Sequence, residues 1–427
     1  MRIYVQGLWH LGIVTAACLA SVGHDIIGFD NDINVINSLN SGKSIIFEPG
    51  LDELINAGLK SGKLKFSSEI NNIDFLLVAY DTPIDDNDII DVNFVISRIE
   101  SMIPSLNNEA IIMISSQMPV GSIKYLEEKF RKYCPEKNIS FVCFPENLRL
   151  GNALNVFLKP DRIIIGYRSN KDKLIVKKLL EPITDKIEWM SIESAEMTKH
   201  AINSFLATSV VFANEIASIC EKTGADSKEV ERGLKSDQRI GNKAYLSPGS
   251  AFSGGTLARD VDFLKEVSKK NKLFIPLLES IKISNNNHKL WTKRKIQELF
   301  PSLKGITITV WGITYKSGTN TLRKSLTVEL CNWMISQEAN IQVYDPIVEK
   351  LPPNWYGRVH KFDNMLESLH NTQLLLIGTK YDEYDNFFQN YIPENKLLII
   401  DPNRSISFLE KNKEYNYMSV GSYLKVI

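Results

Sequence analysis

The chain opens with a short apolar strand, a glycine turn, a helix and a second strand, and this order admits few folds. Ile3 to Val5 are apolar, Gly7 and Gly12 flank the turn, and the spacing predicts a helix over Ile13 to Ser21 before the strand Asp25 to Phe29. Two strands joined through a helix pair in parallel, because the helix returns the chain across the sheet. The opening segment therefore predicts a βαβ unit.

The alternation of strands and helices continues along the chain in two series, which are separated by a helical part. Apolar runs at 75–78, 110–114, 140–143 and 163–165 alternate with polar helical segments; long helical stretches follow from 194, and a second alternating series begins near 304. We predict an α/β fold class with two Rossmann-like doubly wound parallel-sheet domains joined by a central helical domain with a long helix. The expected boundaries are 1–193, 194–299 and 300–427.

Composition excludes several partners. The 427 residues contain 50 Lys and Arg against 50 Asp and Glu, so there is no overall basic field for nucleic acid or an anionic membrane. The five cysteines are scattered and include no C-x-x-C pair, which argues against a disulfide framework and against a metal site and favours a cytoplasmic location. No run of about 18 uninterrupted apolar residues occurs, so we expect no membrane span. A small-molecule partner is expected.

The glycine turn has the position of a dinucleotide site. A strand precedes it and a helix follows it, so backbone N–H groups can meet a pyrophosphate there, although Trp9 stands where the fingerprint has its second glycine. Asp30 lies 18 residues after Gly12 and ends the second strand, where a carboxylate binds ribose hydroxyls and repels a 2′-phosphate. We predict NAD as cofactor, contacted by Gly7, Trp9, Leu11, Gly12 and Asp30. The alternative is a glycine turn that binds nothing.

A series of sequence blocks carries a family resemblance over nearly the whole chain. These blocks include VTAACLASVGH, IFEPGLDELI, SSQMPVGS at 115–122, FPENLRLGNALNVFLKPDRIIIG at 144–166, SAEMTKHAINSFLATSVVFANE at 194–215, AYLSPGSAFSGGTLARD at 244–260 and WGITYKSGTNTLRKS at 311–325. In these blocks the chain resembles the UDP-glucose, UDP-N-acetylmannosamine and GDP-mannose dehydrogenase family. The resemblance implies an NAD-dependent oxidoreductase of polysaccharide biosynthesis that acts on nucleotide-linked sugars.

Members of that family remove two hydrides in succession from a primary alcohol and yield a uronic acid through a cysteine thioester. The resemblance implies that Lys199 stabilises alkoxide charge, with Asn203 on the same helical face, and that Asp260 orders a catalytic water. It implies a catalytic role for Glu146 as well. Taken alone, a Lys and an Asn on an amphipathic helix are more often solvated surface residues.

This sequence departs from the family pattern where the second oxidation takes place. Thr256 stands at the position of the catalytic cysteine, and a threonine hydroxyl has a far higher pKa than a thiol. Gln117 replaces a water-binding threonine, and Leu150 replaces a glutamate. Thr256 stays a candidate catalytic residue because it can donate a hydrogen bond.

Further residues are assigned to binding by the resemblance alone. Cofactor contacts are implied for Thr82 and Arg323, and substrate contacts for Phe144, Leu148, Arg149, Tyr245, Phe252, Gly254 and Lys316. Arg and Lys on the 311–325 segment suit a diphosphate. A long helix of the kind that begins near Ala195 forms the family's dimer interface, so a homodimer is expected.

The retained and the replaced residues together predict an NAD-dependent oxidation, or the reverse reduction, that stops after one hydride transfer. The expected substrate is an alcohol on a nucleotide-linked sugar or a similar anionic small molecule. Two alternatives stay open at this point. One is a full four-electron oxidation to a uronic acid through an aldehyde hydrate, with Asp260 and Lys199 holding the water. The other is a pseudoenzyme that binds a nucleotide or a partner protein without turnover.

Overall fold

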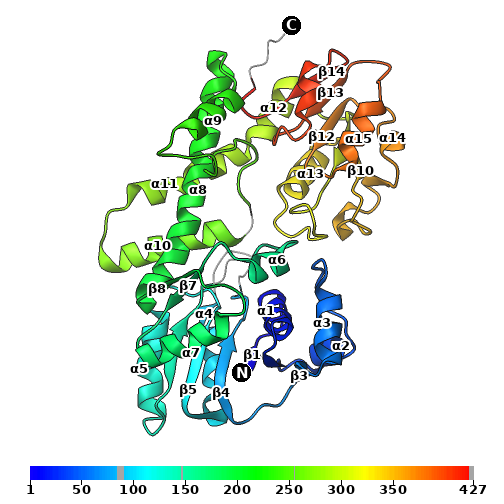
Figure 1. The fold of residues 1–427 in the computed structure, drawn as a ribbon. Helices are drawn as coiled ribbons and strands as arrows, with labels where there is room; N and C mark the ends of the chain where they lie inside the picture. Colours follow the sequence, from blue (N-terminus) through cyan, green and yellow to red (C-terminus); the bar gives the residue numbers. More distant parts are fainter. Residues whose placement is uncertain (84–90, 146–147, 254, 423–427) are drawn as a thin grey trace. The chain divides into compact units, whose positions relative to one another are not determined.

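The computed structural model describes residues 1–83, 91–145, 148–253 and 255–422 (Figure 1). The chain divides into two compact units, Met1–Ile202 and Asn203–Ile427. Two of the predicted site residues, Glu146 and Gly254, lie outside the described residues. The three-domain boundaries expected from the sequence stay a prediction.

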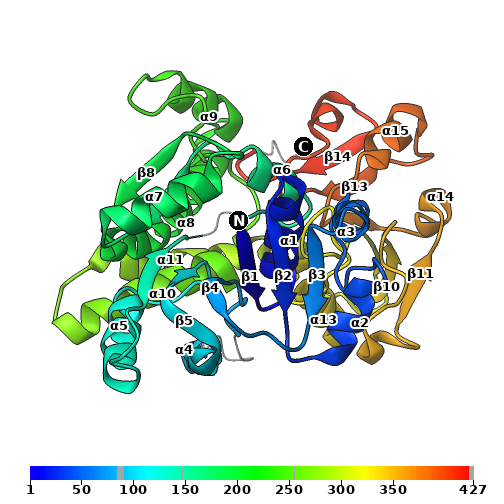
Figure 2. The same cartoon turned by 60° about the horizontal axis from the view of Figure 1, so that its bottom comes forward.

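The first unit is built on a sheet of eight strands in the order β3-β2-β1-β4-β5-β6-β7-β8. Its strands are β1 (Arg2–Gln6), β2 (Asp25–Phe29), β3 (Leu64–Ser67), β4 (Ile73–Val78), β5 (Leu106–Ile114), β6 (Ser140–Cys143), β7 (Ile163–Gly166) and β8 (Ile187–Met190). Neighbours pair in parallel except β6 with β7. Figure 2 shows β1 to β5 side by side. The predicted mostly parallel sheet is confirmed.

Helices cover both faces of this sheet. One core contains Ile3 and Val5 and involves α1 (His10–Ser21), α2 (Ile33–Asn40), α3 (Leu51–Lys60), α6 (Ala153–Leu158) and α7 (Asn170–Leu180). The other contains Tyr4 and involves α4 (Val92–Glu100), α5 (Ser122–Tyr133) and the first turns of α8 (Ile192–Thr223). Because successive strand residues point to opposite faces, β1 contributes to both cores. Burial on both faces explains the apolar run Ile3-Tyr4-Val5 within this strand.

The long central helix predicted from the sequence is α8, which has 32 residues. Among the described residues it is the one helix long and apolar enough to cross a membrane by length and composition, and 44% of its most apolar window is buried in the protein. A core helix passes the same test, so this feature is weak evidence for a membrane span.

The second unit begins within α8 and continues through α9 (Ser227–Ser236), α10 (Gly255–Asn271), α11 (Pro276–Lys289) and α12 (Trp291–Leu299). A small apolar core joins α8, α10 and α11 through Ala207, Val211, Val261 and Ile281. Partly buried Phe252 packs against this core. The loop that precedes α10 is therefore anchored on this core through Phe252.

A second parallel sheet follows, with six strands in the order β11-β10-β9-β12-β13-β14. Its strands are β9 (Thr307–Trp311), β10 (Asn340–Tyr344), β11 (Val359–Phe362), β12 (Leu374–Ile377), β13 (Leu397–Ile400) and β14 (Tyr415–Met418). The helices of this part are α13 (Leu326–Ser336), α14 (Met365–Ser368) and α15 (Glu383–Asn390). The order matches that of the first six strands of the other sheet, which confirms two Rossmann-like sheets.

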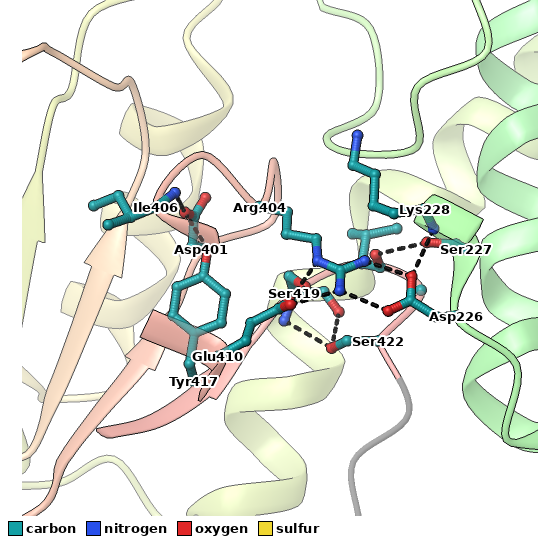
Figure 3. A network of polar contacts seen from close by, with 12 residues as sticks. Asp226, Ser227, Lys228, Asp401, Arg404, Ile406, Glu410, Tyr417, Ser419 and Ser422 are labelled. Atoms are coloured by element: carbon teal, nitrogen blue, oxygen red, sulfur yellow. Dashed lines mark hydrogen bonds and ion pairs between the residues drawn. The ribbon is translucent and has the colours of Figure 1, made fainter. Parts of the chain in front are cut away.

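An ion network joins the start of α9 to the segment after β13 (Figure 3). The Arg404 guanidinium donates to both carboxylate oxygens of Asp226 at 2.6 Å each and also pairs with Glu410. The Arg404 side chain is 9% exposed, and its hydrogen bonds hold the pKa of Asp226 below the usual range. A buried guanidinium is stable only while its carboxylates remain.

Arg404→Met is expected to lower the free energy of unfolding by about 3 kcal/mol, because two carboxylates then lose their partner inside the protein. Asp226 is partly exposed, which keeps the expected loss at the lower end for a buried pair. The control is Arg239→Met, since Arg239 pairs with Asp237 but is 90% exposed; it should cost less than about 1 kcal/mol. Urea denaturation measures the free energy of unfolding of both variants. Equal losses would show that the Arg404 network stabilises the fold no more than an exposed ion pair does.

Candidate active site

The glycine turn after β1 requires glycine at both ends. Gly7 has φ +91°, its N–H donates to the Phe29 carbonyl at 3.0 Å, and a Cβ there would lie 2.7 Å from the Tyr80 ring. A Cβ on Gly12 would lie 1.7 Å from the Gly7 carbonyl oxygen. A side chain on Gly12 would therefore push the first turn of α1 away from the strand, and a side chain on Gly7 would displace the Tyr80 ring.

The N-terminus of α1 lies at this turn. Its first helical hydrogen bond runs from the Ile13 N–H to the Trp9 carbonyl at 2.9 Å, which leaves the preceding N–H groups outside the helical pattern. Trp9 is the N-cap residue, makes no side-chain capping bond and is 53% exposed. Leu11 is buried in the apolar core, so it offers a pyrophosphate its backbone rather than its side chain.

Asp30 fixes the turn from the end of β2. One carboxylate oxygen accepts the Leu8 N–H at 2.9 Å, and the other accepts the Asp32 N–H at 3.0 Å. Asp30 is half-buried, and a carboxylate has about four acceptor positions, so these two bonds leave capacity for ribose hydroxyls. The geometry of turn, helix end and carboxylate fits a dinucleotide.

A buried glutamate that the sequence analysis missed supports the same region. Glu48 accepts the Gly151 N–H at 2.9 Å and the Ala153 N–H at 2.7 Å at the start of α6, and it bonds the His10 ring at 3.0 Å. Glu48 is 5% exposed. It therefore links the first turn of α1 to the start of α6, although 105 residues separate Glu48 from Ala153.

Lys199 lies in the first unit, 9% exposed, in a small pocket of about 20 Å³. The pocket is lined by Ile114, Ser115, Ser116, Gln117, Met118, Ile123, Cys143, Pro145, Glu196, Lys199 and His200. The structure thus brings Lys199 together with Gln117, one of the residues that depart from the family pattern. Thr82 contacts the same loop, since its hydroxyl donates to the Gln117 carbonyl at 2.5 Å. A space of this size holds about one water molecule.

Cys143 also lines the Lys199 pocket, which raises the question of whether it replaces the missing cysteine. Burial raises the pKa of the Cys143 thiol well above its ordinary value, and the nearby Glu196 carboxylate adds to the shift. The nucleophile in a thioester route is the thiolate, so a thiol held neutral is a poor one. Cys143 is better explained as a core residue at the end of β6.

Glu196, which also lines this pocket, connects α8 to the start of α5. Its two carboxylate oxygens accept the Gly121 N–H at 2.7 Å and the Ile123 N–H at 3.0 Å, which caps α5 from the side of α8. Burial raises the pKa of Glu196, and the two backbone bonds oppose that shift. Because Lys199 lies one turn later on α8, this carboxylate fixes the helix against the 115–121 loop. No local sequence pattern marks Glu196, because its partners lie on another helix.

In the second unit, Asn203 and Asp260 are brought together. The Asn203 amide donates to the Asp260 carboxylate, and Asp260 is fully buried. Asn203 lies one turn after Lys199 on α8, and Thr256 lies one turn before Asp260 on α10. Thr256 itself is exposed in the first turn of α10. The Asn203 amide thereby fixes the orientation of the buried carboxylate.

The remaining predicted residues differ in exposure. Phe144 is buried and packs edge-on against Phe157 at 6.5 Å between ring centroids, so its side chain belongs to the core. Tyr245 is 60% exposed, Leu148 is partly buried, and Arg149, Lys316 and Arg323 are exposed. None of these residues lines the Lys199 pocket as far as the structure describes it. Their roles in binding stay predictions.

Three family models match the chain in order. They describe the NAD binding domain of the UDP-glucose/GDP-mannose dehydrogenase family over residues 1–184, its central domain over 193–287 and its UDP binding domain over 309–407. The chain belongs to the UDP-glucose/GDP-mannose dehydrogenase family. The cofactor predicted from the glycine turn and Asp30 is therefore confirmed as NAD.

Relatives support this assignment over the full length. The UDP-glucose 6-dehydrogenase of Rickettsia prowazekii (strain Madrid E) is 30% identical over 442 aligned residues, which cover 99% of this chain and 100% of that protein. The UDP-glucose 6-dehydrogenase TuaD of Bacillus subtilis (strain 168) is 30% identical over 90% of this chain and 84% of that protein. A UDP-glucose dehydrogenase from Pyrobaculum islandicum has the same fold, with a TM-score of 0.86 at 22% identity over 99% of this chain and 98% of that one.

Within this family assignment, Asp30 predicts the choice between the two nicotinamide cofactors. Wild-type protein should bind NAD(H) well ahead of NADP(H), because a carboxylate repels a 2′-phosphate. Asp30→Asn removes the charge but keeps an acceptor for the turn, so the ratio of the two Kd values should narrow by about tenfold or more. Asp32→Asn is the matched control, because Asp32 is an exposed carboxylate that caps α2. Equal wild-type affinities in a calorimetric titration would contradict the assignment.

Proposed function

We propose that this protein oxidises the primary alcohol of a nucleotide-linked sugar to an aldehyde with NAD and stops after one hydride transfer. The observation that carries the proposal is the pairing of retained and replaced groups. Lys199 is buried in a pocket, and Asn203 donates to the buried Asp260, whereas Thr256 holds the position that a cysteine has in the family pattern. The retained Lys199, Asn203 and Asp260 suit the oxidation of the alcohol. The cysteine that Thr256 replaces is the residue that a thioester intermediate needs.

NAD bound at the glycine turn supplies the hydride acceptor. The alcohol carbon gives up a hydride and the hydroxyl gives up a proton, so one aldehyde, one NADH and one proton form. Lys199 stabilises negative charge on the hydroxyl oxygen as that proton leaves. Its burial strengthens this effect, because a charge interaction is worth more where water is excluded.

A second oxidation would need a nucleophile on the aldehyde. Thr256 has a hydroxyl of high pKa on an exposed turn, and burial raises the pKa of the Cys143 thiol in the Lys199 pocket. Gln117, which also lines that pocket, stands where the family has a water-binding threonine. These residues support release of a carbonyl product.

For the substrate, we propose a UDP-linked sugar. The support is the match of residues 309–407 to a UDP binding domain and the names of the relatives, which are UDP-glucose 6-dehydrogenases. Lys316 and Arg323 lie exposed on the segment between β9 and α13, and Arg suits a forked grip on a diphosphate. We assign them to the phosphates of the substrate and to the cofactor, respectively.

The deciding experiment is the stoichiometry of the reaction with UDP-glucose. We expect one NADH per molecule consumed and a carbonyl product that a hydroxylamine reagent traps. Two NADH and a uronic acid would favour the hydrate route, in which Asp260 and Lys199 hold a water. No NADH with any nucleotide sugar tested would favour the pseudoenzyme.

Two variants serve as controls for this experiment. Lys199→Ala should lower turnover by about 100-fold, the usual scale for one charge-stabilising donor, with NAD affinity nearly unchanged. Thr256→Cys alone should not restore acid formation, because Gln117 and Leu150 still stand where the family has polar helpers. A turnover rate in Lys199→Ala equal to that of the wild type would show that Lys199 does not stabilise the charge on the alcohol oxygen.

We also propose a homodimer formed through α8. Four large apolar residues on this helix are exposed at spacings of about two turns: Met197 (37%), Phe205 (69%), Phe212 (45%) and Ile219 (58%). Residues at this spacing lie on one stripe of a helix, and an exposed apolar stripe on a long helix suits a second copy of the same stripe.

Light scattering should give twice the chain mass of 48.4 kDa. Phe205→Asp should shift the protein toward monomer, because it places a charge in the apolar stripe. Ile392→Asp is the control, since Ile392 is 78% exposed and lies after α15. A wild-type monomer at micromolar concentration would contradict the dimer.

For location, we propose the cytoplasm. All five cysteines are free and buried, and scattered free thiols are typical of a reducing compartment.

A further inference from the structure

The loop before α10 is held by side chains rather than by regular secondary structure. The Gly249 N–H donates to the Asn214 side chain on α8 at 2.9 Å, and the Ser250 N–H donates to the Asn403 side chain after β13 at 2.8 Å. Two distant segments of the second unit thus fix the backbone of consecutive loop residues.

Helix α11 supplies the strongest contacts to this loop. The Asn285 side chain accepts the Phe252 N–H at 3.0 Å and donates to the Phe252 carbonyl at 2.9 Å, as a neighbouring strand would. One turn later, the His288 Nε2 donates to the Gly249 carbonyl at 2.8 Å. All bonds are of ordinary length.

Burial shows that these side chains do not point to solvent. Asn285 is 3% exposed and His288 is 7% exposed. Polar side chains buried on a helix cost free energy unless their hydrogen bonds are made, so an apolar residue would be the default at both positions. Burial lowers the pKa of His288, which keeps the ring neutral and its Nε2 a donor to the carbonyl.

The loop leads into the residues assigned to the reaction. Phe252 packs on the core shared by α8, α10 and α11, and four residues later Thr256 begins the turn that ends at Asp260. A shift of the Phe252 backbone therefore moves a predicted substrate contact, whereas the glycine turn predicted to bind the cofactor belongs to the first unit.

We propose that Asn285 is a positioning residue which fixes the backbone at Phe252, and so sets the affinity for the nucleotide sugar but not for NAD. His288 acts on the same loop at Gly249. This inference rests on the proposed function, because it takes the loop at 244–253 as a substrate-binding segment. Only a carboxamide of this length provides both bonds: an aspartate lacks the donor, and a leucine of similar shape lacks both groups.

The test uses the full-length protein with UDP-glucose and NAD as probes. Asn285→Leu should raise KM for UDP-glucose by about tenfold or more, with kcat changed less than about threefold and the Kd of NAD unchanged. The matched control is Asn286→Leu, the same substitution at the next position, where the side chain is exposed. It should change neither constant.

A second pair of variants covers the case in which Asn285→Leu does not fold. His288→Gln keeps a donor for the Gly249 carbonyl and should retain most of the affinity for UDP-glucose, whereas His288→Leu should lose that affinity.

Calorimetric binding of UDP-glucose separates this inference from the proposed function. If wild-type protein binds UDP-glucose without producing NADH, the oxidation fails but the loop variants still report on affinity. Unchanged UDP-glucose affinity in both Leu variants, or no binding by wild type, would overturn the inference.

Discussion

Each of the two parallel sheets depends on an aspartate at the carboxyl end of its second strand. Asp30 accepts the Leu8 N–H at 2.9 Å in the first sheet, and Asp345 accepts the Ile313 N–H at 2.8 Å in the second. In both, the preceding glycine donates to the residue before the aspartate, at 3.0 and 2.9 Å. These bonds satisfy the polar groups of a tight turn at the carboxyl edge of the central strand. The two sheets share this construction without a visible sequence repeat.

The two aspartates differ in what remains available to a ligand. Asp345 is 4% exposed and also accepts the N–H groups of Ile347 and Val348, so its carboxylate is taken up by the fold. Asp30 is half-buried and accepts from Asp32 as its one other backbone contact in the described chain. The two turns therefore share one geometry, but the half-buried Asp30 keeps acceptor positions that the buried Asp345 uses within the fold. Burial of the carboxylate makes the difference.

Sequence patterns predicted the elements well and the supporting contacts poorly. The long helix expected to begin near Ala195 is observed as Ile192–Thr223, because apolar periodicity extends over many turns. The family resemblance singled out Lys199 and Asn203 as candidate site residues. Glu48, Glu196 and Asn285 were missed, and their partners lie 105, 73 and 33 residues away along the chain. No local pattern marks a side chain whose partner is so distant.

The sequence by itself determined the strand and helix periods, the glycine turn, the family blocks and the replacement at Thr256, since each is a property of residues close together along the chain. Only the tertiary structure decided which polar groups are buried and what they bind. It placed Cys143 in the Lys199 pocket and joined Asn203 to Asp260. The reason is physical: the pKa of a thiol and the orientation of a carboxylate depend on desolvation and hydrogen bonds, which distant segments supply.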